Sequence, residues 1–87
     1  MPERTVTIGS AHGLHARPAS LFVQAVTASG LPVHLTKGDK TLNAASILGV
    51  ISLGIDHGDQ ITLAAEGDNA DAVLDQLVDL LTTDMDA

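Results

Sequence analysis

The strongest constraint on the fold is the spacing of apolar residues, which changes period several times along the chain. TVTIG alternates, with Val6 and Ile8 on one side, and this period of two predicts a strand that ends at Gly9. From Ala16 onward the spacing becomes helical, and Gly30 predicts where that helix stops. The apolar stripe of this helix consists of Ala19, Phe22, Val23 and Val26.

The same reasoning places the remaining elements. LPVHLT alternates again and predicts a second strand, and KGDK predicts a turn into a short strand over residues 41–43. SILGVISLGI is apolar but short, so it predicts a short helix from Ile47, followed by a loop through DHGD. QITLAAEG predicts a fourth strand, and DNADAVLDQLVDLLTT predicts a last helix. The apolar face of that helix consists of Val73, Leu74, Leu77 and Leu81.

The order strand, helix, strand, strand, helix, strand, helix predicts an α+β fold. Helices should cover one face of the sheet and leave the other face in water. The polar residues that alternate with the apolar ones fit this open face: Thr5, Thr7, His34, Thr36 and Thr62. With no internal repeat or linker, residues 1–87 are expected to form a single domain.

Composition excludes several classes of function. Four basic and eleven acidic residues give a net charge of −7, and Phe22 is the only aromatic residue, so nucleic-acid binding is not expected. The chain has no cysteine, which removes disulfides and thiolate metal sites. No apolar run approaches the roughly 18 residues of a membrane span. No secretory signal is evident, and we expect a cytoplasmic protein without membrane insertion.

The basic residues all lie in the first half of the chain, where a site for an anion is therefore sought. There the segment GLHARPAS places His15 directly before the helical stripe. The first N–H groups of a helix, here those of Ala16 and Arg17, have no intrahelical partners and lie in positive potential. The Arg17 guanidinium adds donors that suit phosphate oxygens, and Pro18 is tolerated in a first turn.

A neutral imidazole is a competent nucleophile near neutral pH. The segment therefore fits a histidine that accepts a phosphoryl group. From the residues alone, a second interpretation stays open, in which His15 is a polar residue that caps the helix.

Two segments carry a resemblance to a known family. GLHARPAS resembles the active-site signature of HPr, the histidine-containing phosphocarriers of the bacterial phosphoenolpyruvate:sugar phosphotransferase system, and NAASILGVISLGI is similar to the family's second signature. The resemblance covers essentially the whole chain. It implies that His15 accepts the phosphoryl group through Nδ1 and that Arg17 stabilises it. It also implies that Ser46 corresponds to a serine that a dedicated kinase modifies in some members.

The resemblance further implies a carrier that is not an enzyme, with no cofactor and no metal. Its fold would be an open-faced sandwich of four strands, in the order 1-4-2-3, and three helices. Its partners would be enzyme I and enzyme IIA domains, with a serine kinase/phosphorylase and a transcriptional regulator as further candidates. We expect a monomer with no deep cleft at the histidine.

Ser46 stands directly before Ile47, so its structural role is predicted to be that of a helix N-cap. Val50 and Leu53 should point inward from the short helix. The remaining apolar residues should face outward and form a docking surface with two residues of the first helix. This predicted docking surface consists of Ser20, Gln24, Ile47, Leu48 and Ile51.

The sequence also departs from the family pattern. Ala45 stands where many members have lysine, which weakens the case for recognition by the serine kinase. Gln24 and Thr27 stand where members often have lysines that help docking on enzyme I, so docking would depend more on apolar contact and on Arg17, or on a partner of altered charge. The other histidines are interpreted as polar surface residues: His12 and His57 in loops and His34 on the open face. His12 and His15 could form a metal pair, but no third ligand is evident.

Two alternative functions remain open at this stage. The first is an HPr-like regulator, for example of a nitrogen-related relay, which would use the same histidine. The second is a noncatalytic module that binds a small ligand, and it predicts a ligand cavity and indifference to His15→Ala.

Overall fold

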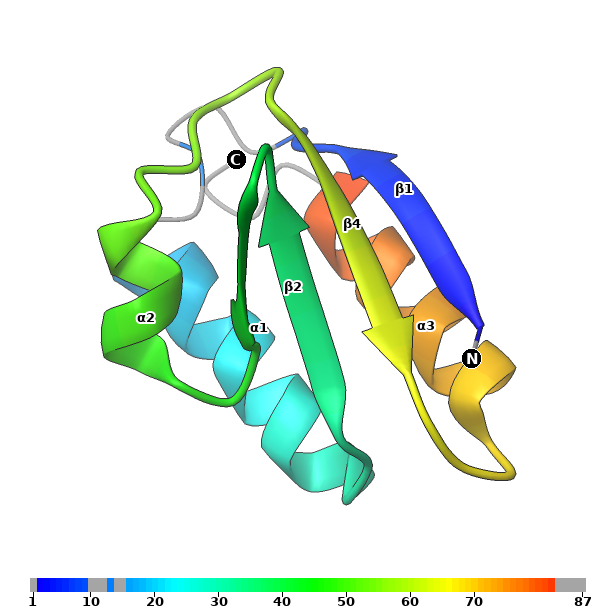
Figure 1. Cartoon of the computed structure of the whole chain (residues 1–87). Helices are drawn as coiled ribbons and strands as arrows, with labels where there is room; N and C mark the ends of the chain where they lie inside the picture. The colour runs from blue at the N-terminus through cyan, green and yellow to red at the C-terminus, as the bar shows by residue number, and fades with distance from the viewer. Residues whose placement is uncertain (1, 10–12, 14–15, 83–87) are drawn as a thin grey trace.

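The computed structural model describes residues 2–9, 13 and 16–82, and within them the chain follows the predicted order of elements (Figure 1). The elements are β1 (Glu3–Thr7), α1 (Ala16–Ser29), β2 (Val33–Lys37), β3 (Lys40–Asn43), α2 (Ile47–Ser52), β4 (Gln60–Ala65) and α3 (Ala70–Thr82). Most element ends differ from the predicted ones by one or two residues, and both ends of β1 differ. β1 starts earlier because Glu3 pairs with Ala64, and it ends at Thr7 because the Gly9 N–H bonds to Leu81 O at the end of α3.

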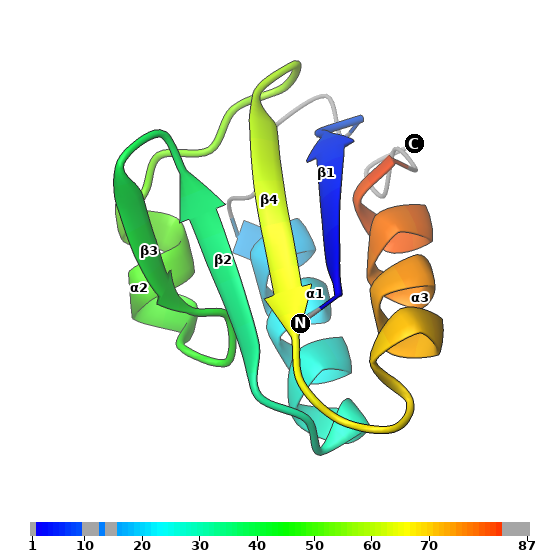
Figure 2. The ribbon, with the colours of Figure 1, turned by 45° about the vertical axis from the view of Figure 1, so that its right-hand side comes forward.

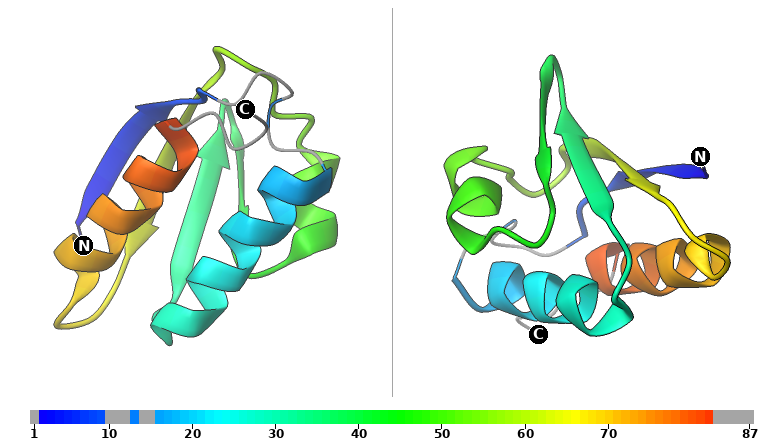
Figure 3. Two further views of the ribbon diagram at one scale, coloured as in Figure 1. Left: turned by 180° about the vertical axis from the view of Figure 1, so that it is seen from behind. Right: turned by 60° about the horizontal axis from the view of Figure 1, so that its bottom comes forward.

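The strands form one antiparallel sheet in the order β1-β4-β2-β3, which confirms the predicted α+β fold and strand order. α1 and α3 lie side by side under one face of the sheet and contact each other, as Figures 2 and 3 show. α3 also contacts β1 and β4. α2 packs against α1 and β3 at one edge of this layer.

The core lies between the sheet and the helix layer. On β4, Ile61, Leu63 and Ala65 are buried, which is the alternation expected of a sheet with one covered face. Phe22 is fully buried on α1, and the predicted apolar face of α3 is buried as well. The apolar stripes of the helices pack against the apolar face of the sheet. The opposite, polar side of each element therefore faces solvent.

The opposite face of the sheet carries a row of threonines that crosses all four strands. Thr5 lies opposite Thr62, Thr62 opposite Thr36, and Thr36 opposite Thr41. The hydroxyl oxygens of Thr5 and Thr62 are 3.2 Å apart, and those of Thr36 and Thr41 are 2.9 Å apart. These residues are exposed or partly exposed, which confirms the predicted open face.

One exposed cluster ties the sheet to the last helix. The Arg4 guanidinium, on β1, donates hydrogen bonds to the carboxylates of Asp71, at 3.0 Å, and Asp75, at 3.3 Å, both on α3. Solvent-exposed ion pairs contribute little to the free energy of folding. These pairs nevertheless occupy the guanidinium of Arg4, one of the four cationic side chains.

Candidate functional site

Helix α1 begins at Ala16, the residue that follows His15, as the sequence predicts. The N–H groups of its first turn therefore have no intrahelical partner, and a helix of 14 residues adds about half a positive charge at this end. His15, Leu14 and His12 lie outside the described residues. The structure describes the residues that directly follow His15, and with them the positive potential at the start of α1.

The first turn of α1 separates an inward and an outward side. Pro18 and Ala19 are buried, and Pro18 loses no helical hydrogen bond at this position. Arg17 is exposed. No residue that the structure describes forms a hydrogen bond or an ion pair with its guanidinium.

The distribution of ion pairs makes Arg17 distinctive. Of the four cationic side chains, Arg4 is bound to two α3 carboxylates and Lys37 to Asp59. Within the described part of the chain, only Arg17 and Lys40 have no carboxylate partner. On a protein of net charge −7, the start of α1 thus combines an unpaired arginine with the positive end of a long helix.

Gly13, two residues before His15 in the sequence, makes an unusually close backbone contact. It is buried and has a φ of +71°, a conformation that residues with a Cβ rarely adopt. A Cβ here would overlap Ile55 O and would lie 2.7 Å from Asp56 Cα. Gly13 therefore rests directly on the backbone of the connection between α2 and β4.

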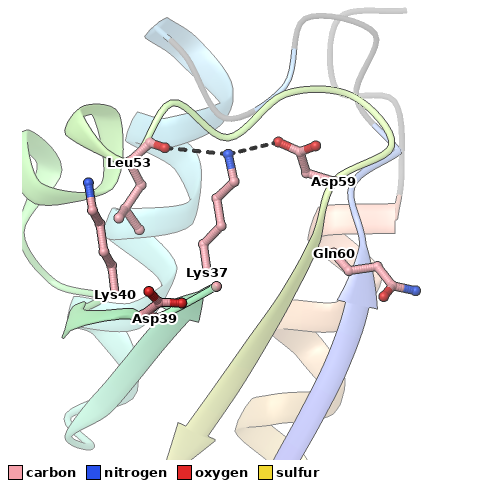
Figure 4. A pocket seen from close by; sticks show the side chains of 7 residues that line it. Lys37, Asp39, Lys40, Leu53, Asp59 and Gln60 are labelled. Atoms are coloured by element: carbon pink, nitrogen blue, oxygen red, sulfur yellow. Dashed lines mark hydrogen bonds and ion pairs between the residues drawn. The ribbon is translucent and has the colours of Figure 1, made fainter.

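That connection, residues 54–59, is held from its other side by Lys37 (Figure 4). The Lys37 ammonium donates to Gly54 O at 3.0 Å and to Leu53 O at 3.5 Å, and it pairs with the Asp59 carboxylate at 3.0 Å. The same carboxylate accepts a hydrogen bond from the Asp56 N–H at 2.9 Å. The Asp56 hydrogen bond, with help from Lys37, lowers the pKa of Asp59 below its ordinary value.

Sequence reasoning missed this cluster, although it contains a signal. Lys37 alternates in phase with Val33 and Leu35, so a charged residue occupies the covered face of β2 at the end of the strand. A lysine in that phase must find polar partners near the helix layer. Here the partners are the carbonyls at the C-terminal end of α2, where a positive charge is favourable.

A cavity of about 440 Å³ lies beside this cluster, and sequence reasoning did not place it. It is lined by Lys37, Gly38, Asp39, Lys40, Leu53, Asp59 and Gln60.

Helix α2 places Ser46 as predicted. Ser46 is exposed and is the N-cap residue, because its Oγ accepts a hydrogen bond from the Gly49 N–H at 3.2 Å. Val50 is fully buried and Leu53 is half-buried, as predicted. The three outward residues are Ile47, 37% exposed, Leu48, 78% exposed, and Ile51, 39% exposed.

The two remaining residues of the predicted docking surface lie on α1. Gln24 is exposed and Ser20 is partly exposed, and the Gln24 amide donates to Ser20 Oγ at 3.3 Å. α2 packs beside the N-terminal half of α1, so all five residues come from two adjacent helices (Figures 1 and 3). Among the other histidines, His34 is half-buried on the open face and His57 is exposed in the connection after α2.

In the described part of the chain, no helix is both long and apolar enough to cross a bilayer.

Comparison with known proteins gives a consistent result. A family model described as the PTS HPr component phosphorylation site matches residues 2–83. Phosphocarrier protein HPr of Streptomyces coelicolor is 50% identical over 82 residues, which are 93% of this chain and 88% of the relative. The HPr-like protein Crh of Bacillus subtilis is 39% identical over 77 residues, which are 88% of this chain and 91% of the relative.

Solved structures agree in fold. The crystal structure of HPr-C-His from Thermoanaerobacter tengcongensis matches with a TM-score of 0.89 at 43% identity, covering 93% of this chain and 91% of that one. A crystal structure of an HPr dimer from the same organism matches with a TM-score of 0.71 at 44% identity, covering 92% of each chain.

An open-faced sandwich that presents an arginine-bearing helix start defines a small α+β protein that can receive an anion at its surface. With the matched family model and the relatives above, the chain belongs to the HPr family. It is a phosphocarrier of the phosphotransferase system, a protein that carries a phosphoryl group and is not itself a catalytic enzyme.

Proposed function

We propose that His15 is the residue that carries the phosphoryl group, receiving it from phosphorylated enzyme I and delivering it to enzyme IIA domains. The observation that carries this proposal is the start of α1 at Ala16, directly after His15, together with the unpaired Arg17. The free N–H groups, the helix dipole and the guanidinium all favour a dianion at that point.

The chemical step is an exchange of one bond to phosphorus for another. The lone pair of neutral His15 Nδ1 attacks the phosphorus, a P–N bond forms on His15, and the bond between phosphorus and the donor breaks. The electron pair of the broken bond stays with the donor. Transfer to enzyme IIA repeats these events with His15 as the leaving group, so the carrier must stabilise the phosphoryl group only moderately.

The helix start suits this balance. A charge near a helix end gains about 0.3–1 kcal/mol when exposed, and at most ~2 kcal/mol in partly buried geometries. Arg17 is exposed, so its contribution is weakened by solvent in the free carrier and strengthened when a partner excludes water. Arg17 therefore contributes most within the complexes in which transfer takes place.

The docking surface for enzyme I and enzyme IIA is proposed to consist of Ser20, Gln24, Ile47, Leu48 and Ile51. Large apolar side chains on a surface helix indicate a protein contact, and Leu48 is the most exposed of them, at 78%. The surface carries no lysine, so apolar contact and Arg17 would provide most of the attraction.

Ser46 is proposed as a site of regulatory phosphorylation. A phosphate at an N-cap is compatible with the helix, so the modification would act by placing about −1.5 to −2 charges beside Ile47 and Leu48. Ala45, which precedes it, differs from the lysine that many family members have there, and this bears on recognition by a serine kinase.

A regulatory role is a second candidate function, and the relative Crh favours it, since Crh is described as the catabolite repression HPr of Bacillus subtilis. In either role we propose a cytoplasmic monomer, with a serine kinase/phosphorylase and a transcriptional regulator as further partners. The enzyme IIA domain that accepts the phosphoryl group from this chain distinguishes the two roles.

The direct test is incubation with phosphoenolpyruvate, Mg²⁺ and enzyme I of the same organism, followed by intact mass measurement. The wild-type protein should gain one phosphoryl group that is labile in acid and stable in alkali, and His15→Ala should gain none. His12→Ala is the matched control and should be phosphorylated. A wild-type protein that remains unmodified with its own enzyme I, or a phosphorylated His15→Ala variant, would overturn the proposal.

A further inference from the structure

Gly13, two residues before His15, is connected to the cluster of Lys37 and Asp59 beside the cavity. The connection runs through the backbone of residues 54–56. Gly13 packs against the backbone of Ile55 and Asp56, so closely that a Cβ at Gly13 would lie 2.7 Å from Asp56 Cα. Ile55 is fully buried, which anchors this piece to the core. The position of Gly13 is therefore set by the position of residues 55 and 56, which we call the seat of the histidine segment.

Polar contacts to Lys37 and Asp59 hold the seat on both of its flanks. On the α2 side, the Lys37 ammonium donates to Gly54 O at 3.0 Å, directly before Ile55. On the β4 side, the Asp59 carboxylate accepts from the Asp56 N–H at 2.9 Å. The ion pair between Lys37 and Asp59, at 3.0 Å, joins these two contacts into one clamp (Figure 4).

The same connection is attached to the end of β1, on the other side of the histidine segment. Ile8 N donates to Asp59 O at 2.9 Å, and Gly58 N donates to Ile8 O at 3.0 Å. Ile8 and Gly13 thus contact the same connection.

The partial burial of Lys37 and Asp59 also supports a positioning role for their contacts. The side chains of Lys37 and Asp59 are 32% and 34% exposed, so each is partly shielded from water. Lys37 contacts two carbonyls as well as the carboxylate, which restricts its position more than a simple surface ion pair would.

We propose that Lys37 and Asp59 are positioning residues for phosphoryl transfer, acting through the seat and Gly13 on the placement of His15. This inference rests on the proposed role of His15. Neither residue touches the phosphoryl group in this mechanism. Misplacing a reacting group by about 1 Å can cost about 100-fold in rate, so a clamp that acts through the seat and Gly13 can still determine the rate of transfer.

The test compares Lys37→Met with Lys40→Met. Both variants remove one positive charge from the same cavity lining, but Lys40 has no carboxylate partner among the described residues. We expect Lys37→Met to lower kcat for transfer from phosphorylated enzyme I by between about 5-fold and 100-fold, with KM changed by less than about twofold. Lys40→Met should keep kcat, and Lys37→Arg should recover most of the loss.

A second measurement does not depend on phosphoryl transfer. In ¹H–¹⁵N spectra of the unphosphorylated protein, the amide resonances of Gly13 and Asp56 should shift in Lys37→Met and in Asp59→Asn, and stay in place in Lys40→Met. Thermal unfolding of each variant shows that the comparison is made on folded protein. If Lys37→Met does not fold, Asp59→Asn carries the test, with Lys40→Met still as the control.

The outcomes separate the two proposals. If the wild-type protein is not phosphorylated on His15, the proposed function fails, and the amide resonances alone test the clamp. Unshifted Gly13 and Asp56 resonances, a wild-type kcat in Lys37→Met, or an equal loss in Lys40→Met would each overturn the positioning role.

Discussion

The two helices that meet at the proposed docking surface begin in different ways. α1, with 14 residues, starts after His15 with an exposed and unpaired arginine in its first turn. α2, with 6 residues, starts after Ser46, whose own hydroxyl already accepts the Gly49 N–H. Among the described residues, the Arg17 guanidinium at the start of α1 has no partner, whereas the Gly49 N–H at the start of α2 is capped by Ser46.

This difference relates to the two proposed modifications. At α1, bound phosphate would meet donors that no described side chain occupies, which favours temporary binding of a phosphoryl group. At α2, the neighbours of Ser46 are apolar and exposed, so a phosphate there would change a surface that partners contact. The connection that follows the C-terminal end of α2 also contacts Gly13, which stands three residues before α1 in the sequence.

The largest effect is expected for Gly13→Ala, which disturbs the approach to α1. The alanine would adopt a positive φ and its Cβ would overlap Ile55 O, so the seat or the histidine segment must move. We expect stability to fall by about 1–3 kcal/mol from the strain, and transfer from enzyme I to slow because His15 is displaced. Chemical denaturation and single-turnover transfer measure the two effects.

Gly30→Ala is the matched control for that substitution. Gly30 has the same φ of +71°, but a Cβ there would meet nothing within 4 Å. It should lose stability from backbone strain alone and transfer phosphate at the wild-type rate. Equal transfer defects in the two variants would show that strain, and not the close contact with Ile55, explains the effect of Gly13.

The next effect concerns the unpaired charge at α1. Arg17→Met keeps the unbranched stem of the side chain and removes the guanidinium, and we expect transfer to slow by about 10- to 100-fold, below the loss seen for an oxyanion-hole donor. Stability should hardly change, because Arg17 is exposed and contacts no described partner. Stopped-flow measurement of transfer, with Lys40→Met as the charge-matched control, makes the comparison.

If Arg17→Met and Lys40→Met slow transfer equally, overall charge and not the helix start is responsible. The difference between the starts of α1 and α2 would then not explain the rate of phosphoryl transfer.

The sequence predicted the elements that depend on local spacing. The strands and helices follow from periods of two and 3.6, and the exposure of Leu48 follows from a helix too short to bury all its apolar residues. The contact of Gly13 with Ile55 and the clamp of Lys37 on Asp59 were not predicted. Both join residues far apart in sequence, and such pairs depend on how the strands and connections are placed in three dimensions.

The roles of individual site residues stay predictions for a related reason. The family identifies the reaction, and the structure defines the surroundings of Arg17 and Ser46, but the roles of His15 and Ser46 depend on chemistry with partners. The phase of Lys37 on the covered face of β2 shows that sequence can still point to an unrecognised polar cluster.

The smallest effect is expected at α2, where Ser46→Ala and Ser46→Asp separate the cap from the charge. Alanine removes the acceptor of the Gly49 N–H and should cost about 1 kcal/mol, whereas aspartate is itself a good N-cap and should keep stability within about 0.5 kcal/mol of wild type. For transfer from enzyme I the order should reverse. Ser46→Ala should transfer at the wild-type rate, and Ser46→Asp should show a raised KM, because its charge lies beside Ile47 and Leu48.

Ser52→Asp, on the same helix but at its C-terminal end, is the charge control. If both aspartates raise KM equally, the effect belongs to the net charge of the carrier and not to the start of α2.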